Sequence, residues 1–107
     1  MAGITTHVLD TAKGRPAQGV AITLEILRSG WELVGGGVTD ADGRLRTLME
    51  NVSLERAVYR LTFTTGAYDE GGFFPEVTIV FRVDNPEQHY HVPLLLSPFG
   101  YSTYRGS

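Results

Sequence analysis

The sequence predicts an all-β domain, a sandwich or barrel of about eight short strands. Apolar and polar residues alternate along most segments, which is the period of a strand with one buried face. Glycine and proline mark turns between these segments at regular spacing, and the 13 glycines of the chain suit tight connections. A chain of 107 residues has the length of one domain, which we expect to span residues 1–107.

The first half of the chain contains alternating segments separated by clear turns. Strands are expected over residues 4–10, 20–27, 31–39 and 44–48. In the first of these, Thr5 and His7 share one face. The glycines from Gly35 to Gly37 indicate a bulge or a close approach by another backbone. Asp40 to Gly43 is typical of a tight turn, because aspartate side chains bond local backbone and glycine accepts a positive φ.

The second half of the chain contains one strand that differs from the others. Strands are expected over residues 59–65, 76–83, 89–96 and 101–105. Residues 50–56 fit a loop or one helical turn, and residues 66–72 form a glycine-rich connection. Beyond His91, the strand over 89–96 is apolar on both faces, so each face needs a cover. We expect a second copy of the chain to cover one face, with a site in the interface.

Composition excludes several classes of function. The net charge of −3 argues against nucleic acid and anionic membrane as partners. The absence of cysteine excludes a disulfide scaffold, a thiolate nucleophile and a cysteine-based zinc site. The first ten residues lack the basic and apolar regions of a secretion signal, and no apolar run is long enough to span a membrane. We therefore expect a cytoplasmic protein.

The candidate chemical groups are three histidines and the arginines near them. His89 and His91 share one strand face, and with His7 they could hold zinc and leave one coordination position open. The alternative is that His89 is an exposed residue next to a turn and His91 a hydrogen-bonded interface residue. Taken alone, Arg44 is typical of a solvated strand end and Arg105 of a flexible tail.

Four segments of the chain resemble a known family. They are ITTHVLDTAKGRPA, TDADGR, FFPEV and HYHVPLLLSPFGYSTYRGS. They are similar to the 5-hydroxyisourate hydrolases, transthyretin-related proteins of urate degradation in purine metabolism. The resemblance covers nearly the whole chain, and the terminal YRGS is its most specific part. It separates the hydrolases of that family from the hormone carrier transthyretin.

The resemblance implies a transthyretin-like sandwich of two four-stranded sheets with at most one short helix. The segment between Tyr68 and Phe73 is shorter than relatives tend to have, at the place of the family's short helix. Edge-strand pairing would form dimers, and two dimers would form a homotetramer with active sites in the channel between them. The implied reaction converts 5-hydroxyisourate to 2-oxo-4-hydroxy-4-carboxy-5-ureidoimidazoline without metal or cofactor.

The resemblance also implies the residues of the site. The implied catalytic residues are His7, Arg44, His91 and Ser107, and the implied substrate-binding residues are Tyr104, Arg105 and Gly106. His89 would support them. One histidine would act as the base toward water, but the sequence does not decide which one. The alternatives are a carrier that binds a small apolar ligand in the channel, as transthyretin carries hormone, and a zinc hydrolase.

Overall fold

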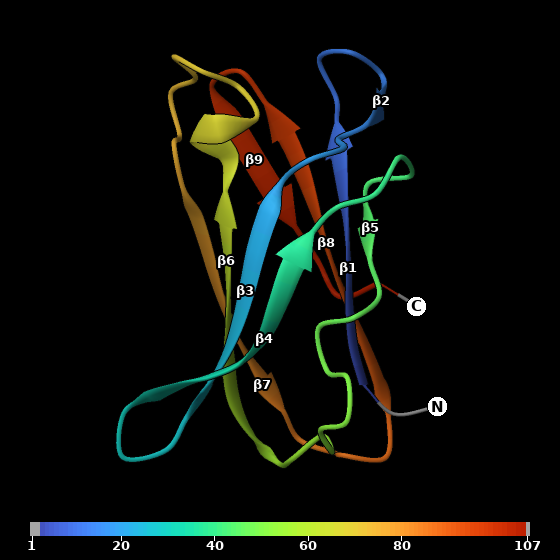
Figure 1. The fold of residues 1–107 in the computed structure, drawn as a ribbon, viewed down its shortest axis with the longest axis vertical. Helices are drawn as coiled ribbons and strands as arrows, with labels where there is room; N and C mark the ends of the chain where they lie inside the picture. Colours follow the sequence, from blue (N-terminus) through green and yellow to red (C-terminus); the bar gives the residue numbers. More distant parts are fainter. Residues whose placement is uncertain (1–2, 107) are drawn as a thin grey trace.

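Two β-sheets face each other in the computed structural model, which describes residues 3–106 (Figure 1). One sheet contains β1 (Gly3–Asp10), β2 (Arg15–Pro16), β5 (Arg44–Leu45), β8 (His89–Ser97) and β9 (Gly100–Thr103). The other contains β3 (Ala21–Leu27), β4 (Trp31–Val38), β6 (Ala57–Thr64) and β7 (Val77–Val83). The strand order is β2-β1-β8-β9 in the first sheet and β4-β3-β6-β7 in the second. Strands β9 and β7 are therefore the edges on one side of the sandwich.

The predicted all-β sandwich with at most one short helix is confirmed. The second sheet has the expected four strands. The first has five because two strands of two residues each, β2 and β5, both pair with β1 on the edge opposite β8. Within residues 3–106 the helical structure is limited to the 3-10 turn η1 (Thr65–Ala67). Residues 50–56 form turn and loop, and no helix of residues 3–106 is long and apolar enough to cross a membrane.

The strand predicted over residues 44–48 is shorter than expected and covers only Arg44–Leu45. Its pairing with β1 stops there, and the chain continues past β4. A Cβ atom on Gly35 would lie 2.1 Å from the carbonyl oxygen of Leu48. The close backbone approach predicted from the glycines of β4 is therefore confirmed. It requires glycine at position 35, because a side chain there would collide with the backbone of Leu48.

The core lies between the two sheets and follows the predicted alternation. Every second residue of β1 is buried, and β3 and β6 show the same pattern. The core residues with no exposed surface include Val8, Leu24, Leu61, Phe63 and Leu94. Each contributes roughly 1.5–3 kcal/mol through burial of its side chain. Because alternate residues point to opposite sides, burial of Val8 and Leu94 turns their strand neighbours to the outer face of the first sheet.

A hydrogen bond between Tyr68 and Asp10 ties the connection after η1 to the end of β1. The Tyr68 hydroxyl donates to Asp10 Oδ2 at 2.6 Å, and the Lys13 N–H donates to Oδ1 at 3.0 Å. Burial of Asp10 opposes its ionisation, but these hydrogen bonds outweigh burial and hold its pKa below the usual value. Burial and the Asp10 hydrogen bond raise the pKa of Tyr68 to about 12, so the phenol remains a donor.

Replacing Tyr68 with phenylalanine is expected to lower the free energy of unfolding by about 1–3 kcal/mol at pH 7, because Asp10 loses a donor. A carboxylate whose pKa is depressed by folding stabilises the protein above its unfolded pKa. That contribution is lost as the pH falls through the folded pKa. The difference between wild type and variant should therefore shrink below about pH 4. Urea denaturation at pH 7 and pH 3 measures the difference in unfolding free energy between the two proteins. An equal difference at both pH values would contradict a stabilising hydrogen bond from Tyr68 to the Asp10 carboxylate.

Candidate active site

Pairing of β1 with β8 brings the two ends of the chain together on the outer face of the first sheet. The two strands run parallel, with Thr5 opposite His91 and His7 opposite Pro93. Figure 1 shows them side by side, β1 in dark blue and β8 in orange-red. The hydroxyl of Thr5 lies 2.8 Å from Nδ1 of His91, although the two residues are 86 positions apart in sequence. The histidines at the two ends of the sequence therefore share one surface.

The turn from Asp40 to Gly43 fixes the start of β5 against β1. The Asp40 carboxylate accepts the N–H groups of Asp42 at 2.8 Å and Arg44 at 3.1 Å. Gly43 has a φ of 73°, and its carbonyl accepts the N–H of Val8 at 2.7 Å. The predicted turn is therefore confirmed, with aspartate and glycine in the roles expected of them. Its consequence is that Arg44 pairs directly opposite a residue of β1.

That residue is His7, so an imidazole and a guanidinium group start from adjacent backbone positions. His7 Nε2 lies 2.7 Å from the carbonyl oxygen of Asp42. A carbonyl can only accept, so the ring donates from Nε2. In the neutral ring Nδ1 then keeps its lone pair and can accept a proton. The turn thus fixes both the position of His7 and its tautomer.

The guanidinium group of Arg44 forms no ion pair within the described part of the chain. Among residues 3–106, the ion pairs of arginine involve Arg28, Arg46 and Arg60, and no carboxylate lies within ion-pairing distance of Arg44. Asp40, at the start of the turn, pairs with Arg46 at 3.3 Å instead. A guanidinium group with free donors next to an imidazole is suited to bind an anionic oxygen.

His91 is half-buried and lies near Arg44 and the other two histidines. Burial, followed by the charges of Arg44, His7 and His89, holds the pKa of His91 below its usual value of 6.5. The ring is therefore neutral at pH 7, with one nitrogen free to accept a proton. Its Nδ1 contacts the Thr5 hydroxyl, which also lies 2.8 Å from Nε2 of His89.

Gly106 packs directly against the ring of His91. After β9, which ends at Thr103 rather than at the predicted residue 105, the chain returns to β8. The N–H of Gly106 donates to the His91 carbonyl at 2.8 Å. A Cβ atom on Gly106 would lie 2.7 Å from Cδ2 of the His91 ring. This position therefore requires glycine if the ring is to keep its place.

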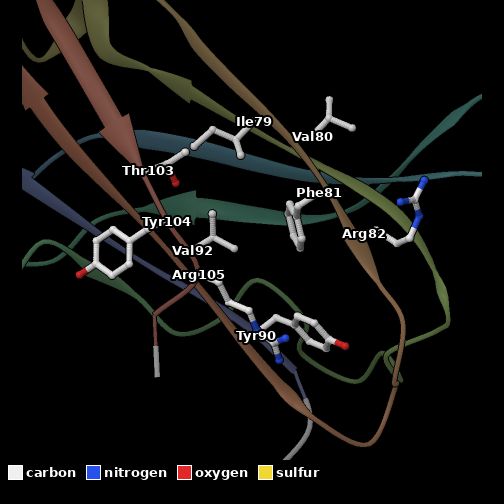
Figure 2. Close-up of a pocket in the computed structure, with 9 residues that line it drawn as sticks. All are labelled: Ile79, Val80, Phe81, Arg82, Tyr90, Val92, Thr103, Tyr104 and Arg105. Atoms are coloured by element: carbon white, nitrogen blue, oxygen red, sulfur yellow. The ribbon is translucent and has the colours of Figure 1, made fainter.

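Tyr104 and Arg105 line a different hollow, in which the Arg105 side chain points toward Tyr90 while the Tyr104 ring points away from the other lining side chains (Figure 2). This hollow of about 310 Å³ is lined mainly by residues of β7, β8 and β9. The Arg105 guanidinium lies 4.2 Å from the centre of the Tyr90 ring, which belongs to the core face of β8. Arg105 is therefore not brought beside His91 in this chain, and substrate binding by Tyr104 and Arg105 stays a prediction. Ser107, predicted as catalytic, lies outside the described residues.

A smaller hollow of about 230 Å³ adjoins His89. It is lined by Gly3, Ile4, Thr5, Arg46, Met49, Glu50 and His89. Over the range 3–106, no group of three or more histidine, aspartate or glutamate side chains is placed to hold a metal ion. The three histidines instead bond to a backbone carbonyl and a shared hydroxyl. This geometry suits proton transfer and binding of a polar ring.

Sequence reasoning missed two groups of this site, the hydroxyl of Thr5 and the backbone carbonyl of Asp42. The alternation along β1 placed Thr5 on the same face as His7, and that signal was present. The register of β1 against β8, which puts Thr5 between two histidines, leaves no local signal in the sequence. A backbone carbonyl leaves none either, because every residue has one.

Comparison with known proteins gives consistent matches over nearly the whole chain. The model of the HIUase/Transthyretin family matches residues 4–106. The 5-hydroxyisourate hydrolase of Salmonella typhimurium is 44% identical, over 97% of this chain and 80% of that protein. The uric acid degradation bifunctional protein of Arabidopsis thaliana is 47% identical over 97% of this chain, which spans only 37% of its length. The structure of Klebsiella pneumoniae 5-hydroxyisourate hydrolase superposes with a TM-score of 0.86 and 37% identity, covering 100% of both chains.

Proposed function

This chain belongs to the HIUase/Transthyretin family, and on that premise we propose that it hydrolyses 5-hydroxyisourate in the degradation of urate. The product would be 2-oxo-4-hydroxy-4-carboxy-5-ureidoimidazoline. The observation that carries the proposal is the outward cluster of His7, Arg44 and His91, held by adjacent strands of one sheet. The 5-hydroxyisourate hydrolases among its relatives support the substrate.

The cluster contains the groups that opening of a cyclic amide needs. Water must add to a ring carbonyl carbon, the C–N bond must break, and the ring nitrogen must take up a proton. A neutral histidine, His7 through Nδ1 or His91, accepts the proton of the attacking water. Arg44 stabilises the negative charge that develops on the carbonyl oxygen. The other histidine delivers a proton to the leaving nitrogen, so that a carboxylate and a ureido group result.

A carrier of a small apolar ligand is the alternative within the same family. Sites for such ligands are lined mostly by apolar side chains with few polar groups. The outer face of β1 and β8 instead presents three imidazoles, with a guanidinium group next to them on β5. The cluster therefore favours chemistry on a small polar ring over storage of an apolar ligand.

We propose that the working form is a homotetramer, a dimer of dimers. Unpaired strand edges at β7 and β9 support edge-to-edge pairing of two protomers, because such edges readily add another strand. The outer face of β8 supports a second interface, since the half-buried Leu95 follows His91 on it. Sedimentation at equilibrium measures the assembly state.

The cytoplasmic location expected from the sequence also stays a prediction, which fractionation of cells followed by an activity assay would test.

The proposed reaction is tested by identifying its product. Fresh ¹³C-labelled 5-hydroxyisourate, made from labelled urate with urate oxidase, is mixed with the protein and followed by ¹³C NMR. The expected result is rapid loss of the substrate signals and appearance of those of the ureidoimidazoline. If the substrate signals decay no faster than in buffer, the protein is not a 5-hydroxyisourate hydrolase.

Replacing Gly106 with alanine is expected to lower kcat/KM by about 10- to 10²-fold, because the added methyl group displaces the His91 ring. The matched control is Gly30→Ala, since a Cβ atom on Gly30 meets nothing within 4 Å and this variant should keep its activity. Steady-state kinetics measure the effect. Equal activity of the two variants would show that the contact with His91 has no catalytic consequence.

A further inference from the structure

We propose that Thr5 is a positioning residue, whose hydroxyl fixes the orientation and tautomer of His91 and links that ring to His89. The inference rests on the proposed hydrolase function and extends its site by two residues. It starts from two hydrogen bonds of 2.8 Å each, which join one hydroxyl oxygen to Nδ1 of His91 and to Nε2 of His89.

The position of the hydroxyl follows from the parallel pairing of the strands. Thr5 lies opposite His91, and His89 lies one alternation earlier on the same face of β8. The branched side chain of threonine has few χ1 rotamers, so its hydroxyl has little freedom to move away. Gly106 packs against the same His91 ring. The ring is thus held by contacts at Nδ1 and Cδ2, and no side chain of residues 3–106 forms a hydrogen bond with its Nε2, the nitrogen that would face the substrate.

The proton count of the bridge couples the two histidines. The Thr5 hydroxyl has one hydrogen, so it can donate to only one of the two rings. If it donates to Nδ1 of His91, that ring is protonated on Nε2 and His89 donates to the hydroxyl. If it donates to His89 instead, His91 is protonated on Nδ1 and presents a free Nε2 lone pair as a base. Thr5 therefore determines whether His91 faces the substrate as an acid or as a base.

The bridge also gives His91 a route for its proton. When His91 takes a proton on Nε2, the ring carries a charge that Arg44 and His7, on the neighbouring strands, disfavour. Its Nδ1 proton can pass to the Thr5 oxygen while the hydroxyl proton passes to Nε2 of His89. His89 is exposed and can release that proton to water. The charge is thereby moved away from the guanidinium group of Arg44.

The kinetic test uses substitutions that separate the hydroxyl from the shape of the side chain. Thr5→Val keeps the shape and is expected to lower kcat by about 10- to 10²-fold while KM changes less than about threefold. Thr5→Ser keeps the hydroxyl and should recover most of the activity. The matched control is Thr11→Val, which removes a hydroxyl bonded to the Leu96 carbonyl at 3.0 Å at the far end of β1. Wild-type activity in Thr5→Val, or equal losses in Thr5→Val and Thr5→Ser, would overturn the proposal.

The second readout does not depend on turnover. Two-bond ¹H–¹⁵N correlation spectra of ¹⁵N-histidine protein report the tautomer and the titration of His91. One tautomer is expected in the wild type and in Thr5→Ser, and a mixture with a changed titration midpoint in Thr5→Val. Spectra of His91 that are identical in wild type and Thr5→Val would reject the bridge. If the wild-type protein did not hydrolyse 5-hydroxyisourate at all, the hydrolase function would fail, while these spectra would still decide the role of Thr5.

Discussion

Alanine at position 91 is expected to lower kcat/KM for 5-hydroxyisourate by about 10²- to 10⁴-fold, the range for loss of a general acid or base. The reason is that His91 presents a neutral imidazole at pH 7 on the exposed face of the site. His7→Ala should cause a loss of the same order, because the Asp42 carbonyl orients that ring as a second acid or base. Absorbance decay of freshly generated substrate measures both variants.

The control for these variants is their folding, since both histidines lie on strands of the first sheet. Neither ring belongs to the hydrophobic core, so the variants should unfold at temperatures close to that of the wild type. A loss of less than about threefold in either properly folded variant would remove that histidine from the mechanism. A full loss of activity together with unfolding would instead assign a structural role to the residue.

Arg44→Ala is the second substitution with a large expected effect, a fall in kcat of about 10²- to 10³-fold. The guanidinium group starts next to His7, and no carboxylate among residues 3–106 forms an ion pair with it. Its charge is therefore available to the oxyanion of the transition state. Arg44→Lys should recover part of the activity, because lysine keeps the charge but lacks the planar pair of donors.

The matched control for Arg44 is the neighbouring exposed arginine, Arg46. It pairs with Asp40 at 3.3 Å, so Arg46→Ala removes the same charge from the same segment of the chain. An exposed pair of this kind contributes little to stability. Activity should stay within about threefold of the wild type. If both alanine variants lost activity equally, the effect would reflect the overall charge of this surface rather than a specific role of Arg44.

The faces of the strands could be predicted from the sequence because their periodicity is local. The alternation along β1 and β8 predicted which residues share a face, and the turn chemistry placed Asp40 and Gly43 correctly. The lengths of β5 and β9 were overestimated. Both strands end where the chain leaves its partner, at Leu45 and Thr103, and continued alternation does not reveal such a departure.

Three residues of the candidate site could be named from the sequence, but their arrangement could not. The resemblance supplied His7, Arg44 and His91, and the structure brings these three to one surface. The parallel register between the first and the eighth strand sets which side chains become neighbours. It is fixed by packing of the whole sandwich rather than by local propensity. Thr5 therefore acquires its two histidine partners only in the folded chain.

The most direct test of the proposed chemistry is the ultraviolet decay of 5-hydroxyisourate with wild-type protein that has been treated with a chelator. Urate oxidase generates the substrate in place, and the spontaneous decay in buffer gives the reference rate. We expect decay well above that reference, unchanged by the chelator, because the histidines and Arg44 supply the proton transfers and the charge. Decay at the spontaneous rate would contradict the hydrolase function. Activity that returns only after zinc is added would contradict catalysis by the histidines and Arg44 alone.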